Sequence, residues 1–543
     1  MGGQAIINLF KEIQMVTLND LSYIHPNKDL LLAGINLVIN KNDKAALVGH
    51  NGTGKSTLLK LIAGRLEPAG GQVKTVSKPY YVPQHFGQFN NFTVAQALGI
   101  AQKLNALEAI INGDVTEENL VLLNDDWTID ERCKEALAYW ELDHIDLLQP
   151  MQTLSGGQKT KVFLAGIAIH RPDIVLLDEP SNHLDAQSRK LLYRYIGSTN
   201  QTLLVVSHDR ALLNLLNVTY EIGERGITAY GGNYDFYAEQ KSVESDAFNH
   251  ALKSKEKLLK KAKDVERDAL ERQQKLDARG KKLKEKAGLP KILMNTLKNN
   301  AERSTSRLKG IHADKVGALS QELTQLRAAL PDADKMKVDL NHSKLHAGKV
   351  LATAVGVNYK YNHEWLWPQN LDFKITSGQR IAIKGPNGSG KTTLIKMILG
   401  ALQPQHGRME RAEGKSVCID QDYSLVNDAL TVYEQAQHFN AGNLQEHDIK
   451  IRLNRFLFTQ AHWNKPCKAL SGGEKMRLML CSLTIMNQSP DVIALDEPTN
   501  NLDMQNVEIL TNAINQYEGT LLVVSHDEYF LEQIRVTDNL DVA

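Results

Sequence analysis

The sequence predicts an α/β fold in which two phosphate-loop domains of similar sequence are joined by a long antiparallel α-helical hairpin. Two observations predict the paired domains. The same four motifs recur in the same order in each half of the 543 residues, and short apolar runs precede several of them. A third observation predicts the hairpin: the residues between the copies are rich in Lys, Arg, Glu, Gln, Leu and Ala.

Length and composition restrict the class of protein. Lys+Arg and Asp+Glu are equal at 63, so any signal for a nucleic-acid partner must be local. The four cysteines lack the pair spacing of a disulfide framework or zinc site, which favours a reducing, cytoplasmic setting. The N-terminus lacks the apolar core of a signal peptide. No run approaches the roughly 20 apolar residues that span a bilayer, so we expect no membrane partner.

The offsets between matching motifs predict the domain boundaries. Lys55 and Lys391 are 336 residues apart, but Glu179 and Glu497 only 318, so the first copy holds about 20 additional residues. They fall within about 93–148, which reads as helical with a loop near 112–114 and is either a tolerated surface insertion or a protrusion that contacts a partner. We predict an N-terminal extension over 1–14, a first domain over 15–240, a linker over 241–346 and a second domain over 347–543.

Each half carries a complete phosphate loop. Glycines let backbone N–H groups surround phosphates at the positive end of the following helix, a lysine neutralises the β and γ phosphates, and a hydroxyl binds magnesium. We therefore predict ATP and Mg²⁺ as cofactors. The predicted residues are Gly49, Asn51, Gly52, Gly54, Lys55, Ser56 and Thr57 in the first copy, and Gly385, Asn387, Gly388, Gly390, Lys391, Thr392 and Thr393 in the second.

Carboxylates and histidines that follow apolar strands supply the chemistry of ATP hydrolysis. Asp178 and Asp496 end such strands and should hold magnesium with Ser56 and Thr392. The next residue in each copy is placed to act as a general base towards water. The further predicted residues are the bases Glu179 and Glu497, the γ-phosphate sensors His208 and His526, and Gln84 and Gln421 as ligands of magnesium and water. Because both glutamates are present, the sequence marks neither site as inactive.

Glycine-rich turns that lead into helices form a second phosphate-binding arrangement in each copy. They comprise Ser155, Gly156 and Gly157 in the first copy, and Ser471, Gly472 and Gly473 in the second. These turns resemble the signature of the ATP-binding cassette (ABC) family of P-loop proteins. The resemblance implies that each signature closes over ATP held by the opposite cassette. It also implies an aromatic platform for adenine, which is Tyr23 in the first copy and Tyr359 or Tyr361 in the second.

The residues between the cassettes show narrow apolar seams of heptad spacing at 252–276 and 316–330. A first helix of about 40 residues would be on the order of 60 Å long. The predicted tip at 279–309 has ten basic residues against two acidic ones, interleaved with apolar side chains, which suits contact with RNA. The candidate RNA-binding residues are Arg279, Lys281, Lys282, Lys284, Lys286, Lys291, Met294, Asn295, Lys298, Arg303, Arg307 and Lys309.

Two segments of the first cassette, 178–185 and 230–240, resemble the ABC-F family, together with the fused cassettes and the basic linker. That resemblance implies an ATPase that binds the ribosome in the ATP-bound state and releases on hydrolysis. Its arm would reach towards the tRNA exit site and the peptidyl-transferase centre, touching large-subunit rRNA or P-site tRNA. The second copy departs from the first, with Asn501 in place of His183 and Glu474 in place of Gln158.

Members of the family act as housekeeping translation factors or protect ribosomes from antibiotics. The apolar core of the tip, at 289–295, favours antibiotic resistance by ribosomal protection over the housekeeping alternative. A peripheral ATPase subunit of an ABC exporter is an alternative from another class, but it gives the basic arm no role. A DNA-handling cassette protein is disfavoured because both cassettes are whole. No obligate protein partner is inferred.

Overall fold

The computed structural model describes residues 13–26, 28–223, 226–286, 310, 313–327, 346, 348–361, 364–486, 488–500 and 502–542. The chain divides into two compact units, which are described separately. One unit comprises Met1–Tyr237 with Met336–Ala543, and the other comprises Ala238–Lys335. The first unit contains both copies of the duplicated domain.

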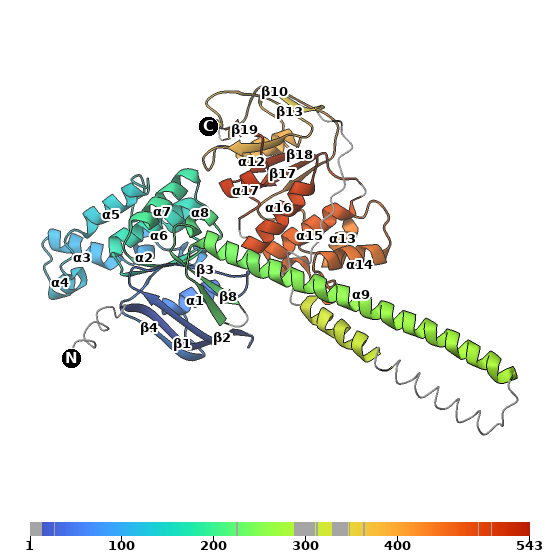
Figure 1. Cartoon of the computed structure of the whole chain (residues 1–543). Coiled ribbons are helices and arrows are strands. Elements are labelled where there is room, and N and C mark those ends of the chain that lie inside the picture. The colour runs from blue at the N-terminus through green and yellow to red at the C-terminus, as the bar shows by residue number, and fades with distance from the viewer. Residues whose placement is uncertain are drawn as a thin grey trace, which may run out of the picture. The chain divides into compact units, whose positions relative to one another are not determined.

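The first copy is built on two sheets (Figure 1). A six-stranded sheet has the order β5-β6-β7-β3-β8-β9 and is parallel apart from the β8–β9 pair, and a three-stranded antiparallel sheet has the order β2-β1-β4. Strands β6 and β7 are buried along their whole length, as expected for parallel strands covered on both faces. The strands are β1 Gln14–Ile24, β2 Leu30–Asn40, β3 Lys44–Val48, β4 Gly70–Thr75, β5 Tyr80–Val82, β6 Ile174–Asp178, β7 Thr202–Val206, β8 Val218–Gly223 and β9 Gly226–Tyr230.

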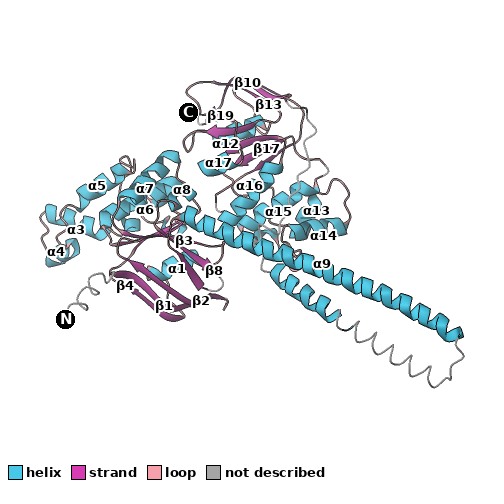
Figure 2. Cartoon of the chain, viewed as in Figure 1, coloured by secondary structure: helices cyan, strands magenta, loops and turns pink. Residues whose placement is uncertain are grey.

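The helices of the first copy include four between residues 93 and 148, so the extra length of this copy is helical (Figure 2). In this region α3 ends at Ile111, and Gly113 turns the chain with a φ of 97°. Helix α1 packs between the two sheets as part of one apolar core. The helices are α1 Lys55–Ile62, α2 Val94–Leu98, α3 Ala101–Ile111, α4 Glu117–Leu123, α5 Ile129–Tyr139, α6 Gly156–His170, α7 Ala186–Ser198 and α8 Arg210–Leu213.

The second copy repeats this plan. Its parallel sheet has the order β16-β17-β18-β14-β19, which matches β5-β6-β7-β3-β8 strand for strand, and its antiparallel sheet has the order β13-β10-β15. The predicted duplication of an α/β domain is therefore confirmed. The strands are β10 Val350–Asn358, β11 Lys360–Tyr361, β12 Glu364–Trp365, β13 Leu371–Thr376, β14 Arg380–Lys384, β15 His406–Arg411, β16 Ser416–Ile419, β17 Val492–Asp496, β18 Thr520–Val524 and β19 Asp538–Asp541. The helices are α12 Lys391–Ile398, α13 Val432–His438, α14 Glu446–Arg455, α15 Gly472–Ile485, α16 Met504–Gln516 and α17 Glu528–Gln533.

The long helix α9, Tyr234–Lys286, runs for 53 residues. It is longer than the sequence predicts because it already begins within the aromatic segment at 230–240. Residues 313–327 form a second helical stretch beside it, where Arg327 Nη2 lies 2.7 Å from Glu256 Oε1 and Lys255 pairs with Glu322. The turn of the predicted hairpin lies outside the described residues.

The candidate RNA-binding residues divide accordingly. Arg279 is exposed on α9. The backbone of α9 also includes Lys281, Lys282, Lys284 and Lys286. The remaining candidates lie outside the described residues: Lys291, Met294, Asn295, Lys298, Arg303, Arg307 and Lys309.

Candidate nucleotide sites

Each phosphate loop ends in a glycine that caps the following helix in the left-handed region. Gly54 has a φ of 94° before α1, and Gly390 has a φ of 89° before α12. A Cβ on Gly54 would lie 2.8 Å from Leu32 Cδ2, and one on Gly390 would lie 2.3 Å from Leu366 Cδ2. Glycine is therefore required at both positions by backbone conformation and by close packing.

The loop lysines lie inside their own loops. Lys55 Nζ donates hydrogen bonds to the Gly49 and His50 carbonyls at 2.7 and 2.9 Å. In the second copy, Lys391 Nζ donates to the Gly385 carbonyl at 2.8 Å and to the Pro386 carbonyl at 2.9 Å. Both side chains are largely buried, and burial lowers the pKa of each amine. An anion bound by the loop amides would bring a negative charge next to each lysine and would stabilise its charged form.

A hydroxyl and a carboxylate lie together beside each loop. Ser56 Oγ donates to Asp178 Oδ1 at 2.9 Å, and Thr392 Oγ1 donates to Asp496 Oδ2 at 2.6 Å. Burial raises the pKa of both aspartates, so a nearby cation would stabilise their charged forms. Hard oxygen donors of this kind, few in number and next to a phosphate loop, fit Mg²⁺.

The two candidate bases share a strained backbone. Glu179 and Glu497 each have a φ of 50°, which non-glycine residues adopt rarely. Each is fixed by a hydrogen bond from its own N–H to the last residue of the neighbouring strand, Val206 or Val524, at 2.8 Å. Because such strain persists where the surroundings impose it and gathers at functional sites, the repeated conformation supports a functional role for both glutamates.

Each glutamate faces a histidine. His208 Nε2 lies 3.2 Å from Glu179 Oε1, a buried oxygen without a hydrogen-bond partner among the described residues. In the second copy, His526 Nε2 lies 3.4 Å from Glu497 Oε1 and 3.2 Å from the Asn387 amide oxygen. Burial raises the pKa of Glu497 to about 7 and lowers that of His526 to about 4. The pKa values of Glu179 and His208 shift in the same directions, again because of burial.

A cavity of about 330 Å³ lies over the first phosphate loop. Its lining includes the loop residues together with Gln84, Glu179 and His208, which the sequence predicts as site residues. Four residues that were not predicted from the sequence also line the cavity: His25, Leu31, Asn182 and Val206. Tyr23 is not part of this lining, although its ring meets that of His25 edge-on at 5.7 Å. His25 could have been predicted from the sequence as a lining residue, because it lies only two residues after the proposed adenine platform Tyr23.

Two tyrosines of the second copy, Tyr359 and Tyr361, are candidates for the adenine platform, and they have different surroundings in the structure. Tyr361 Oη lies 3.2 Å from Thr393 Oγ1, beside the phosphate loop. Tyr359 packs against the apolar core of this copy. Tyr361 is therefore the tyrosine whose hydroxyl contacts the loop helix. Gln421 follows β16, as Gln84 follows β5 in the first copy.

The glycine-rich signature turns are helix N-caps. Ser155 Oγ accepts a hydrogen bond from the N–H of Gln158, whose side chain accepts one from the N–H of Ser155, and Ser471 and Glu474 repeat this pattern. The change from Gln158 to Glu474 therefore preserves the cap. A Cβ on Gly157 would lie 2.7 Å from the His183 carbonyl, and one on Gly473 would lie 2.3 Å from Asn506 Nδ2. Gly156 and Gly472 are the first residues of α6 and α15.

Contacts also join the copies. The N–H of Asn51 donates to Asp503 Oδ2 at 2.9 Å, while Asp503 Oδ1 caps α16 by accepting from the N–H of Asn506. Asn387 Nδ2 donates to the His183 carbonyl at 3.1 Å. Each phosphate loop therefore contacts the segment of the other copy that follows its strand-ending aspartate and the adjacent glutamate. Asp503 was not among the residues predicted from the sequence.

The two sites differ around their aspartates. Tyr81 Oη donates to Asp178 Oδ2 at 2.9 Å, and Arg65 lies over the Tyr81 ring at 4.8 Å from its centroid. By the offset of 337 that relates Gln84 to Gln421, the counterpart of Tyr81 is Cys418. The first aspartate thus has a phenolic donor that the second copy does not provide at the matching position.

This chain is similar in sequence to known ATP-binding cassette proteins. A family model described as "ABC transporter" matches residues 32–182 and 368–500. "Putative ATP-binding protein YdiF" of Bacillus subtilis is 31% identical over 93% of this chain and 77% of its own length. "ABC transporter F family member 5" of Arabidopsis thaliana is 27% identical over 93% of this chain and 72% of its own. The chain belongs to the ABC-F family. Its ABC cassettes bind ATP and make it an ATPase.

A solved structure resembles this ABC-F protein across both cassettes. It contains an archaeal ribosome recycling factor, aABCE1, in complex with the ribosomal stalk protein aP1. The match has a TM-score of 0.58 and 21% identity, covering 95% of this chain and 86% of that one, and it shows a shared fold. Among the residues that the structure describes, no helix combines the length and apolarity needed to cross a membrane.

Proposed function

We propose that this ABC-F ATPase binds the ribosome while ATP holds its two cassettes together, and leaves after hydrolysis. The observation that carries the proposal is the duplicated set of loop lysine, strained glutamate and histidine, with contacts between the copies at both phosphate loops. Family membership and the basic segment at 279–309 support the ribosome as partner.

Each ATP site would use residues of both cassettes. Lys55 and Glu179 would act with Ser471, and Lys391 and Glu497 with Ser155. The lysine neutralises phosphate charge, and the glutamate accepts a proton from the attacking water because its raised pKa makes it a stronger base than an exposed carboxylate. The histidine, kept neutral by burial, can donate a hydrogen bond to the γ-phosphate.

Magnesium, when bound, would neutralise charge on the ATP phosphates. Ser56, Asp178 and Gln84 would hold it in the first site, and Thr392, Asp496 and Gln421 in the second. The hydroxyl–carboxylate pairs already lie within hydrogen-bond distance, so little rearrangement of the protein is needed to form this set.

The function is tested by the variant that combines Glu179→Gln and Glu497→Gln. It should bind ATP without hydrolysing it, remain on ribosomes and stop protein synthesis in a purified translation system. The matched control adds Lys55→Ala and Lys391→Ala, which should restore synthesis by weakening ATP binding. Normal synthesis with the double glutamine variant would contradict the proposal.

For the biological role, we favour antibiotic resistance by ribosomal protection, with a housekeeping translation role as the alternative. Deleting residues 288–295 should abolish resistance and leave ATPase activity unchanged. Unchanged resistance would contradict the protective role. Slow growth of the deletion strain without any drug would instead favour the housekeeping role.

A further inference from the structure

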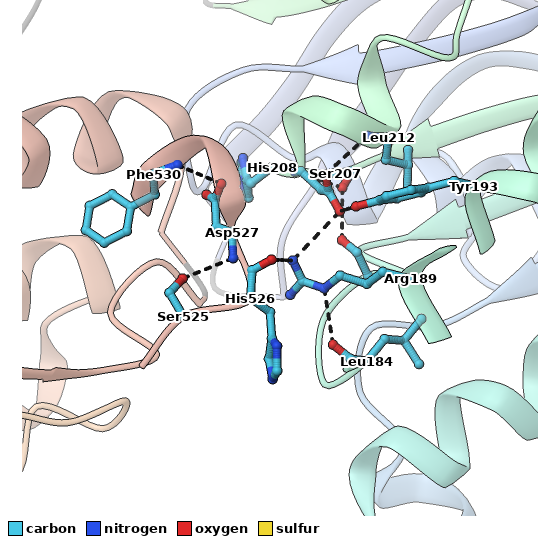
Figure 3. Close-up of polar contacts among 12 residues, drawn as sticks. Leu184, Arg189, Tyr193, Ser207, His208, Leu212, Ser525, His526, Asp527 and Phe530 are labelled. Carbon is cyan, nitrogen blue, oxygen red and sulfur yellow. Dashed lines mark hydrogen bonds and ion pairs between the residues drawn. The ribbon is translucent and has the colours of Figure 1, made fainter. Parts of the chain in front are cut away.

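A largely buried arginine of the first cassette is held by two groups of that same cassette. Arg189 lies in the first turns of α7, and its side chain is 11% exposed. Its Nε donates to the Leu184 carbonyl at 3.1 Å, and its Nη1 lies 3.9 Å from Asp209 Oδ2. Tyr193 donates to the same carboxylate oxygen at 2.5 Å (Figure 3). The guanidinium is therefore held at a fixed place rather than free in solvent.

From that place the same guanidinium reaches the other cassette. Arg189 Nη1 donates to the main-chain carbonyl of His526 at 3.4 Å, as Figure 3 shows. The imidazole of His526 in turn faces the Glu497 carboxylate. The positive charge of Arg189 also favours the ionised form of Glu497, against the effect of burial. A side chain of the first cassette thus touches the histidine loop of the second site.

The reverse contact is not available. The offset of 318 that relates Asp185 to Asp503 places Val507 at the position of Arg189. Val507 is buried and its side chain carries neither charge nor donor. The carboxylate that anchors Arg189 does have a counterpart, Asp527. The second cassette therefore keeps the acidic residue, Asp527, but has Val507 where the first cassette has the positively charged Arg189.

We propose that Arg189 is a positioning residue for the second ATP site, supplied by the first cassette, and that it makes hydrolysis at Glu497 depend on α7 while hydrolysis at Glu179 has no matching control. The role rests on the proposed functions of Glu497 and His526. Its physical basis is one charge-assisted hydrogen bond to the loop that carries His526, made only when the cassettes meet.

Single-site backgrounds test the asymmetry. Glu179→Gln leaves hydrolysis to the second site, and Glu497→Gln leaves it to the first. Adding Arg189→Met should lower kcat about tenfold in the first background, as expected for loss of one such bond, and less than about twofold in the second. Arg189→Lys should recover part of kcat because it keeps the charge but loses the planar fork.

The control is Arg194→Met, an exposed arginine on the same helix, which should leave kcat unchanged in both backgrounds. A readout without turnover uses the double glutamine variant loaded with labelled ATP. Adding Arg189→Met should speed release of one of the two ATP molecules about tenfold and leave the other unchanged, with the thermal unfolding midpoint reporting on folding. Equal effects on both sites, or none on either, would overturn the proposal. Continued ATP hydrolysis by the double glutamine variant would instead refute the assignment of Glu179 and Glu497 as general bases.

Discussion

Replacing Glu497 by glutamine should stabilise the ATP-free protein, and the gain should increase with pH. Burial raises the pKa of this carboxyl from its ordinary 4.5 to about 7 in the folded protein. The folded state therefore holds the proton more tightly than the unfolded state. As pH rises from 4.5 towards 7, the unfolded chain releases the proton first, so wild-type protein loses stability in this window. A shift of this size corresponds to roughly 3 kcal/mol.

The assay is urea unfolding without nucleotide and with EDTA, at several pH values between 5 and 8.5. Trp367 is a suitable fluorescent reporter, because it is buried in the second cassette and its indole N–H donates to the Ser389 carbonyl of the phosphate loop. The stability difference between variant and wild type should grow with pH and level off above about pH 8. Burial lowers the pKa of His526, so its titration makes the folded protein more stable as pH rises. Because His526 is present in both proteins, this contribution largely cancels when the two stabilities are subtracted. Glu532→Gln, an exposed control, should show no trend, and a pH-independent difference for Glu497→Gln would refute the reasoning.

Three further substitutions test hydrogen bonds in the first cassette. Tyr81→Phe should lower the free energy of unfolding in urea by about 1.5–3 kcal/mol, because it removes a hydrogen-bond donor to the buried Asp178 carboxylate. Tyr80→Phe removes a hydrogen bond to the neutral Phe163 carbonyl and should lower it by about 1 kcal/mol. Equal losses would contradict the argument that the charge of Asp178 strengthens the bond. Ser155→Ala should cost about 1 kcal/mol through loss of the α6 cap, measured the same way, and should slow ATP hydrolysis in the Glu179→Gln background. Unchanged hydrolysis there would count against the proposed trans arrangement.

Local sequence was sufficient for the duplicated fold and the phosphate loops. Runs such as 174–178 and 202–206 are apolar throughout because their strands are buried on both faces, and the loop glycines are dictated by backbone conformation. Contacts between distant residues were not predictable in this way. The choice between Tyr359 and Tyr361, the bond from Tyr81 to Asp178 and the reach of Arg189 all depend on tertiary packing. The RNA-binding role of the tip remains a prediction, since most of its residues lie outside the described part of the chain.

ATP-dependent binding to ribosomes is the measurement that tests the proposed function first. The Glu179→Gln, Glu497→Gln variant would be centrifuged through a sucrose cushion with purified ribosomes, in the presence of ATP, of ADP or of no nucleotide, at low and high salt. We predict that it pellets with ribosomes in ATP and stays in the supernatant otherwise, with binding weakened by salt because basic residues meet RNA phosphates. A protein that remains in the supernatant with ATP, or that sediments with membranes when lysate replaces ribosomes, would contradict the account and favour the exporter alternative.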